Sequence, residues 1–238
     1  MSQENETKES ALSLKALSAV LTTFFRLLYN QFAWTYDWVA WIVSLGRWKS
    51  WVMATLSYLP GPKVLELGHG PGHLQAALIQ AGIHGYGIDA SSYMSRTAHS
   101  TMLKKIRSMP LLVNGYAQFI PFQNAAFNQV VATFPTEYIY DLTTLQEIHR
   151  ILQPGGRLVI LLVAWITGRG WLERAAAWLF RVTKQAPAQG PTPNGTPALR
   201  AALGKQLVER LEDNGFQVQV EFKPLESSVL MIIVGDKV

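Results

Sequence analysis

Short apolar runs alternate with stretches of helical periodicity from about residue 61 to the end of the chain. Five runs have the length and apolar content of buried strands: Val64–Leu67, Gly85–Asp89, Leu111–Val113, Asn128–Phe134 and Arg157–Val163. Apolar residues at three- and four-residue spacing predict helices over 74–81, 92–108, 136–152 and 203–214. Strands that alternate with helices favour a parallel sheet with right-handed crossovers.

The C-terminal part of the chain departs from this alternation. Two apolar segments, Phe216–Phe222 and Ser228–Val234, are separated only by a short stretch around Pro224. Strands this close in sequence form a hairpin, which places one antiparallel strand in the sheet. The pattern therefore predicts an α/β fold: a Rossmann-like, doubly wound, seven-stranded and mostly parallel sheet with an antiparallel terminal strand.

The N-terminal quarter has a different character. Residues 1–10 are polar and predict a disordered tail, whereas 11–60 are rich in tryptophan and predict a helical cap before the main domain, 61–238. No stretch of the cap is long and apolar enough to span a bilayer. Its aromatic residues could pack on the core or contact a membrane surface. A second aromatic segment predicts an insert at about 165–199.

Composition narrows the classes of function. The chain has 238 residues, 49% of them apolar, and no cysteine, which excludes disulfides and cysteine-based metal or nucleophile sites. No metal site is predicted. The net charge of +5 comes without the basic tracts of nucleic-acid-binding proteins. With no secretory signal, we expect a cytoplasmic protein, with peripheral contact to the membrane surface as a further expectation.

The segment Lys63–Gln75 carries the clearest chemical signal. An apolar strand breaks into three glycines, Gly68, Gly70 and Gly72, and a helical pattern follows at once. Such a turn lets the backbone approach a ligand, and the helix N-terminus offers free N–H groups. The third glycine comes one position earlier than in dinucleotide-binding turns, and the carboxylate of Glu66 would repel a pyrophosphate but suit a cationic ligand. A plain tight turn is the alternative.

A second acidic residue supports a nucleotide ligand without naming it. Asp89 ends the second strand, 21 positions after Gly68. This spacing places an acid where it can accept hydrogen bonds from ribose hydroxyls, and it also occurs in NAD-binding proteins. From these residues alone, an NAD-dependent enzyme remains an alternative.

Several further segments, in order, resemble those of the class I S-adenosylmethionine-dependent methyltransferases. The resemblance covers about 61–234 and includes Gly115–Val131, Glu147–Ile160 and Leu211–Phe216. The segment Asn30–Asp37 is similar to the N-terminal cap of the branch that contains the ubiquinone and menaquinone C-methyltransferases. The resemblance implies S-adenosylmethionine as cofactor and methyl transfer to a small molecule. The tryptophan-rich cap and the aromatic segment 167–182 predict that this acceptor is apolar or lipid-like. A methyltransferase-like protein that binds the cofactor without catalysis is an alternative.

The resemblance also implies roles for residues at the methionine end of the cofactor. Tyr36 from the cap would close over the carboxylate, and Thr133 at the end of the fourth strand would line the methionine side. The methionine part itself would be held by the glycine turn, through Glu66, Gly68, His69 and Gly70.

Other residues are implied at the adenosine end. Asp89 would bind the ribose hydroxyls with Ala90 beside it, and Met94 would pack on the adenine. Ala117 would offer its backbone N–H to an adenine nitrogen. Tyr116 stands where the family often has an aspartate that bonds the adenine amino group, so a stacking or donating contact would replace that bond.

No catalytic residue is assigned by the sequence. A base is needed only if the acceptor must lose a proton, and the residues available near the expected site are His69, Glu137 and Tyr138. Alternatively, His69 would be a solvent-exposed residue of the turn, and Glu137 would cap the helix that is predicted to start beside it.

Overall fold

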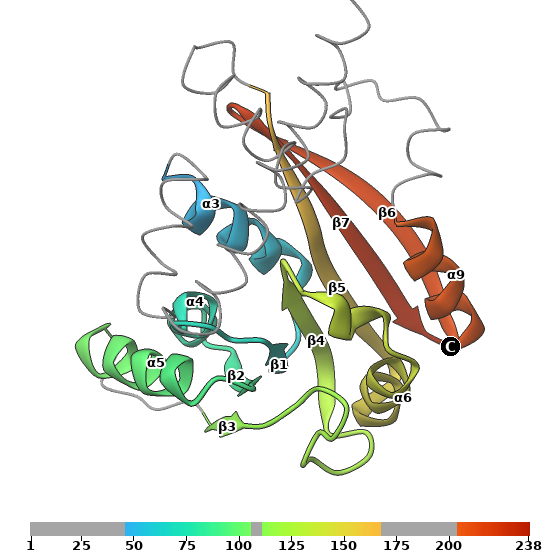
Figure 1. Cartoon of the computed structure of the whole chain (residues 1–238), viewed down its shortest axis with the longest axis horizontal. Coiled ribbons are helices and arrows are strands. Elements are labelled where there is room, and N and C mark those ends of the chain that lie inside the picture. The colour runs from blue at the N-terminus through green and yellow to red at the C-terminus, as the bar shows by residue number, and fades with distance from the viewer. Residues whose placement is uncertain (1–45, 106–110, 168–203) are drawn as a thin grey trace, which may run out of the picture.

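The structure, a computed structural model, describes residues 46–105, 111–167 and 204–238 (Figure 1). Its centre is one seven-stranded sheet with the order β3-β2-β1-β4-β5-β7-β6. The strands are β1 (Lys63–Leu67), β2 (His84–Asp89), β3 (Leu111–Asn114), β4 (Phe127–Thr133), β5 (Leu152–Ile166), β6 (Phe216–Leu225) and β7 (Ser228–Lys237).

Strand directions confirm the predicted fold class. The first five strands pair in parallel, and β7 runs antiparallel to both β5 and β6. The hairpin predicted at the end of the chain is therefore present, and its second strand inserts between β5 and β6. Strand order reverses between β1 and β4, which is the switch point where open α/β sheets bind their ligands.

Helices cover both faces of the sheet (Figure 1). One face carries α3 (Trp48–Met53), the 3-10 helix η2 (Ala54–Tyr58), α4 (His73–Gln80) and α5 (Ser92–Lys105). The other carries the 3-10 helix η3 (Glu137–Tyr140), α6 (Leu142–Ile151) and α9 (Lys205–Asp213). Two apolar clusters result, one on each face, because most residues of β1, β4 and β7 and the middle of β5, residues 158–161, are buried.

The region predicted as one helix over 136–152 is two elements. The 3-10 helix η3 ends at Tyr140, and α6 begins after Asp141, whose backbone is extended and whose carboxylate accepts a hydrogen bond from the Thr143 N–H at 3.0 Å. Asp141 is thus the N-cap of α6. The prediction that Glu137 caps a long helix is wrong, since Glu137 is the first residue of the short η3.

Strand β5 is longer than predicted at both ends, because it starts at Leu152 and continues through Ile166. Trp165, placed by the sequence in an insert, belongs to this strand, is 5% exposed and stacks on Phe222 of β6. The remainder of the predicted insert, residues 168–199, lies outside the described residues.

Only the last part of the predicted cap is described. Trp51 in α3 is buried against the sheet, and Trp48 packs beside it, which agrees with the expectation that cap aromatics pack on the core. The tail and the rest of the cap, including Tyr36, lie outside the described residues. Within residues 46–105, 111–167 and 204–238, no helix has the length and hydropathy to cross a membrane.

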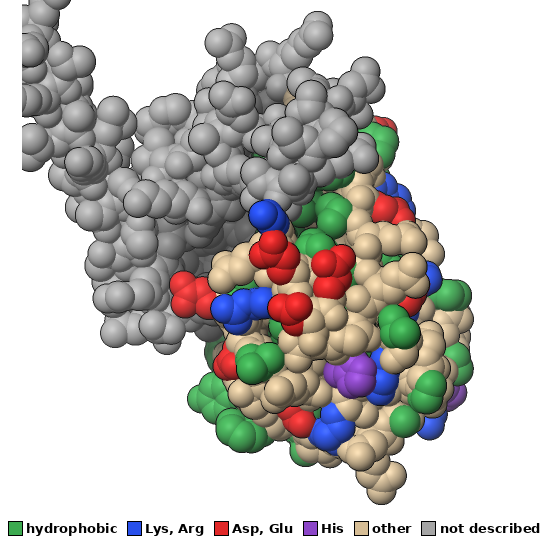
Figure 2. All heavy atoms as spheres, turned by 90° about the vertical axis from the view of Figure 1, so that its right-hand side faces the viewer, with side chains coloured by type: hydrophobic (Ala, Val, Ile, Leu, Met, Phe, Trp, Pro, Cys, Tyr) green, Lys and Arg blue, Asp and Glu red, His purple; other side chains and the backbone are tan. Residues whose placement is uncertain are grey.

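The surface on the α9 side shows charged side chains of both signs among scattered apolar ones (Figure 2). An exposed pair of this kind joins Lys205 and Glu209 on α9, with an N–O distance of 3.5 Å. Charges of alternating sign on an amphipathic helix are typical of a solvated face.

A partly buried ion pair on α6 fixes the loop that precedes β4. The Arg150 guanidinium donates to Glu147 at 2.7 and 2.8 Å and to three loop acceptors: the Ile120 and Phe122 carbonyls and Asn124 Oδ1. The Glu147 carboxylate also accepts from the Ile120 N–H at 2.8 Å. One pair therefore satisfies several backbone groups of a loop that has no strand partner.

We expect Arg150→Ala to lower the free energy of unfolding by about 1–3 kcal/mol, because hydrogen bonds to a charged group are lost and loop carbonyls lose their donors. Urea denaturation measures the change. Lys205→Ala, which removes a solvent-exposed ion pair, serves as control and should cost less than about 0.5 kcal/mol. Equal losses in the two variants would contradict this role of Arg150.

Candidate functional site

The carboxyl ends of β1, β2 and β4 meet at one edge of the sheet. In the observed register, Leu67 of β1 lies opposite Ile88 of β2 on one side and Ala132 of β4 on the other. The residues that follow these three positions surround a cavity of about 320 Å³. Its lining residues are Gly68, Gly70, Ile88, Asp89, Ala90, Ser91, Met94, Gly115, Tyr116, Ala117, Gln118, Thr133, Phe134, Pro135, Thr136 and Tyr138.

The glycine turn forms the floor of the cavity beside β1. Gly68, Gly70 and Gly72 all have positive φ, at 70°, 51° and 81°, a conformation that disfavours residues with a Cβ. At Gly70 a Cβ would meet no atom within 4 Å, so the space above this residue is open for a ligand. At Gly72 a Cβ would lie 3.0 Å from Ala98 and Met102, so this third glycine serves the packing of α4 against α5.

Asp89 joins the turn to the end of β2. Its Oδ2 accepts from the Gly70 N–H at 2.9 Å, and its Oδ1 accepts from the Ser91 N–H at 2.8 Å. Each carboxylate oxygen keeps a further lone pair for hydroxyl donors in the cavity. Ser91, which the sequence reasoning missed, also accepts at its Oγ from the Met94 N–H at 3.3 Å and so orders the start of α5.

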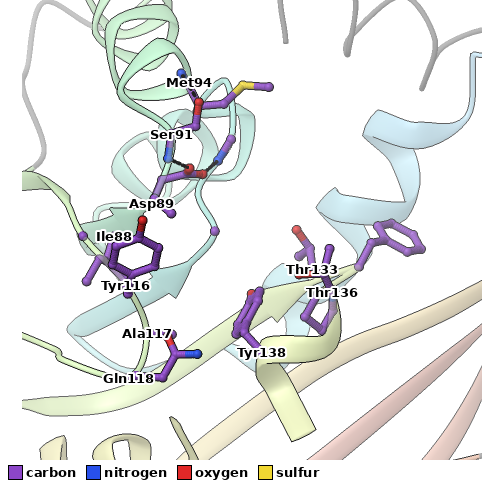
Figure 3. Close-up of a pocket in the computed structure, with 16 residues that line it drawn as sticks. Ile88, Asp89, Ser91, Met94, Tyr116, Ala117, Gln118, Thr133, Thr136 and Tyr138 are labelled. Atoms are coloured by element: carbon purple, nitrogen blue, oxygen red, sulfur yellow. Dashed lines mark hydrogen bonds between the residues drawn. The ribbon is translucent and has the colours of Figure 1, made fainter. Parts of the chain in front are cut away.

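The predicted adenosine-side residues are brought together on one wall of the cavity, opposite Thr133, Thr136 and Tyr138 (Figure 3). Met94 is 9% exposed and lines the cavity from α5, whereas Tyr116 is 65% exposed. The sequence reasoning missed Gln118, whose Nε2 donates to Asp141 at 3.1 Å. The position of Gln118 directly after Ala117 was the only sequence feature that could have pointed to it as a cavity residue.

The opposite wall follows β4. Thr133 lines the cavity as predicted, and the Tyr138 hydroxyl donates to the Leu67 carbonyl at 3.1 Å, directly beside Gly68. Between them the sequence reasoning missed Phe134, Pro135 and Thr136.

Phe134 has a strained backbone. Its φ of 49° lies in the left-handed region, which costs a residue with a Cβ roughly 1–2 kcal/mol. Its ring stacks on Trp48 at 4.3 Å between centroids, and such aromatic pairs contribute about 0.5–1.5 kcal/mol beyond their buried area. The cost of the left-handed backbone and the stabilisation from the ring contact are therefore of comparable size.

Glu66 lies beneath the turn and does not line the cavity. It is 2% exposed, and one of its oxygens accepts from Gln75 Nε2 of α4 at 2.9 Å. Burial raises the pKa of this carboxyl to about 8; the Gln75 hydrogen bond opposes the rise and the negative charge of Asp89 adds to it. The protonated form of Glu66 is thus favoured at neutral pH. A direct contact of Glu66 with the methionine part of the cofactor stays a prediction.

Two residues considered as catalytic bases are placed away from the cavity lining. His69 is 2% exposed, so the alternative of a solvent-exposed turn residue is wrong; its Nδ1 donates to the Gly70 carbonyl at 2.8 Å, and burial lowers its pKa. Glu137 is exposed on η3. Tyr138 is the only one of the three that lines the cavity.

Comparison with known proteins identifies the family. A family model described as a methyltransferase domain matches residues 65–160. A demethylmenaquinone methyltransferase of Chlorobaculum tepidum is 31% identical over 170 residues, which cover 68% of this chain and 66% of that protein. One of Thermotoga maritima is 28% identical over 224 residues, which cover 88% of this chain and 94% of that protein.

Solved structures share the fold. A methyltransferase of Thermotoga maritima superposes with a TM-score of 0.58 at 19% identity and covers 89% of this chain and 98% of its own. A Haemonchus contortus phosphoethanolamine N-methyltransferase in complex with S-adenosylhomocysteine gives a TM-score of 0.55 at 18% identity, covering 81% of this chain and 53% of its own.

The fold, the cavity at the switch point and these relatives define a class I methyltransferase. The chain belongs to the S-adenosylmethionine-dependent methyltransferases of this class and resembles the demethylmenaquinone methyltransferases. These findings favour the methyltransferase over the NAD-dependent alternative. The site fits the cofactor, since Asp89 presents carboxylate lone pairs to the cavity and the space above Gly70 is open.

The raised pKa of Glu66 gives a stability that depends on pH. The unfolded chain releases this proton near pH 4.5 and the folded protein near pH 8, so between these values the folded state binds more protons and stability falls as pH rises. We expect Glu66→Gln to remove a slope of up to about 1.4 kcal/mol per pH unit over this range.

Urea denaturation of Glu66→Gln and the wild type across this pH range measures the effect. The variant should gain stability relative to the wild type as pH rises. Glu212→Gln, on the exposed side of α9, is the matched control, and its difference from the wild type should stay flat. A flat difference for Glu66→Gln as well would contradict the buried neutral carboxyl.

Proposed function

We propose that this methyltransferase acts on a small, uncharged and apolar acceptor, an aromatic ring with hydroxyl groups of the demethylated quinol type. One observation carries the proposal: among the described residues that line the cavity, Asp89 is the only one with a charged side chain. A charged acceptor would need a partner of opposite sign in such a site. The names of the relatives, demethylmenaquinone methyltransferases, support the same acceptor class.

One wall of the cavity would bind the cofactor, and the other would position the acceptor. Asp89, Met94 and the Ala117 backbone would hold the adenosine part of the cofactor, and the turn at Gly68 and Gly70 would approach the methionine part. When bound, S-adenosylmethionine supplies a methyl group activated by its sulfonium. The protein then mainly has to align the acceptor and exclude water.

Tyr138 is the group best placed to orient a hydroxylated acceptor. Its hydroxyl donates to the Leu67 carbonyl at 3.1 Å, which holds its ring in the cavity wall opposite the adenosine-side residues. A ring held at this position would orient the acceptor by direct contact. We therefore assign Tyr138 a role in orientation. The acceptor loses one proton as it gains the methyl group, and with no described residue assigned as a base this proton passes to solvent.

Asp89 is expected to dominate cofactor affinity. Asp89→Ala should weaken binding of S-adenosylmethionine about ten- to a hundredfold, because hydrogen bonds to a charged acceptor are lost. Isothermal titration calorimetry measures the dissociation constant. Asp213→Ala, on exposed α9, is the control and should bind as the wild type. Equal affinity of Asp89→Ala and the wild type would rule out the proposed ribose contact.

The acceptor class is tested with demethylmenaquinone, chemically reduced and carried in anionic phospholipid vesicles. We expect methylated product by mass spectrometry and co-sedimentation of the protein with the vesicles. The expectation of surface contact rests on the aromatic cap and on Tyr116 and Phe119, which are 65% and 76% exposed near the cavity. A charged amine of similar size is the control acceptor and should not be methylated.

The methylation assay and the co-sedimentation assay test two separate parts of the proposal. Methylation without co-sedimentation would retain the acceptor class and reject the membrane contact. Cofactor binding with no methylation of the reduced quinone would overturn the acceptor proposal and favour either another acceptor or a protein that binds the cofactor without catalysis.

A further inference from the structure

The left-handed residue at the end of β4 has no local reason to adopt its conformation. Phe134 is neither glycine nor asparagine, and it directly follows the last strand residue, Thr133. Bulky residues are rare in this region and persist only where surrounding contacts fix them. The contacts that fix Phe134 therefore determine the course of the next residues, Pro135 and Thr136, which line the cavity.

Two kinds of contact hold Phe134. Its backbone N–H donates to the Leu161 carbonyl of β5 at 2.8 Å, which ties the start of the turn to the sheet. Its ring stacks on Trp48 with an interplanar angle of 30°, and it also meets Trp51 at 6.0 Å and 55°. Both tryptophans belong to α3, so the side chain of a cavity residue is held by the segment that precedes the α/β core.

Burial differs between the two tryptophans. Trp51 is 1% exposed and belongs to the core cluster on this face of the sheet, so its loss would affect the whole domain. Trp48 is only partly buried, at the edge of the cluster, and makes the closer ring contact with Phe134. Trp48 is therefore the residue whose removal would release the turn while sparing the core.

We propose that Trp48 is a positioning residue for methyl transfer: its stack on Phe134 holds the left-handed turn and so fixes the acceptor wall formed by Pro135, Thr136 and Tyr138. The inference rests on the proposed function for the identity of this wall, since the predicted adenosine-side residues lie on the opposite wall, whereas Thr133, predicted to line the methionine side, precedes Phe134 on this one. Trp48 acts through Phe134 and need not touch either substrate. Acceptor use should therefore depend on Trp48 while cofactor affinity does not.

The first readout does not involve activity. In Trp48→Ala, hydrogen exchange within residues 134–138, measured at the N–H groups of Phe134 and residues 136–138 because Pro135 has none, should accelerate about tenfold or more as the turn opens locally. Exchange in β4 should stay as in the wild type. Trp48→Phe keeps an aromatic ring for stacking and should restore most of the protection. Phe222→Ala, which removes the comparable stack on Trp165 at the sheet edge, is the matched control and should leave residues 134–138 unchanged.

The second readout separates positioning from general destabilisation. For the reduced quinone acceptor, Trp48→Ala should raise KM and lower kcat, with a combined loss in kcat/KM of about tenfold, while the dissociation constant of S-adenosylmethionine changes less than about twofold. Glycine adopts the left-handed conformation without strain. In a Phe134→Gly background, Trp48→Ala should therefore cause no further loss, as expected for two residues that act as one unit.

The outcomes are distinct. Unchanged exchange at 134–138 in Trp48→Ala, or a loss of kcat/KM that is additive with Phe134→Gly, would overturn the positioning role. Equal weakening of cofactor and acceptor would also overturn it, because the effect would then be global. If the reduced quinone is not methylated by the wild type, the proposed acceptor fails, and the exchange of Trp48→Ala against Trp48→Phe alone decides the role of Trp48.

Discussion

The site depends on a single carboxylate that holds two strand ends together. Asp89 accepts one hydrogen bond from the glycine turn after β1 and one from its own loop after β2, with the two oxygens used separately. A turn with three residues of positive φ would otherwise be free to take many conformations, because glycine loses more backbone entropy on folding than any other residue. The carboxylate fixes the turn and still retains lone pairs for a ligand. The structural role of Asp89 therefore coincides with its proposed role in binding.

The electrostatic character of the cavity follows from what surrounds that carboxylate. Glu66, the other acid of the turn region, is buried, and its pKa is raised to about 8; His69 is buried with a lowered pKa. Burial therefore disfavours the charged form of both groups beneath the turn. Among the described residues that line the cavity, Asp89 is the only one with a charged side chain, and this lining supports the proposal of an apolar acceptor.

Sequence patterns were sufficient where local chemistry determines structure. The strand–glycine–helix unit, Asp89 and the terminal hairpin follow from periodicity and turn residues. The structure confirms them: Gly68 and Asp89 line one cavity, and the hairpin forms β6 and β7 at the other end of the strand order. The break before α6 was missed because apolar spacing continues through Asp141, and only its cap contact with Thr143 shows the boundary. The left-handed Phe134 could not be predicted at all, since a contact with distant Trp48 accompanies it and no turn residue marks it. Burial of Glu66 and His69 likewise depends on tertiary packing rather than on sequence.

The hydrogen bonds from Arg150 to the loop before β4 have a consequence for how such an enzyme can change its acceptor. The loop that carries Gln118 is attached to α6 through Asp141, Glu147 and Arg150, whereas the segment after β4 is attached to α3 through Phe134. The Gln118 loop and Phe134 thus contact helices on opposite faces of the sheet, α6 and α3, whereas Tyr138 on η3 lies on the same face as α6. Substitutions in α3 and the turn it contacts can reshape one wall while the other keeps its geometry. Related enzymes with this arrangement can therefore evolve to use different acceptors while the residues proposed to bind the common cofactor stay unchanged.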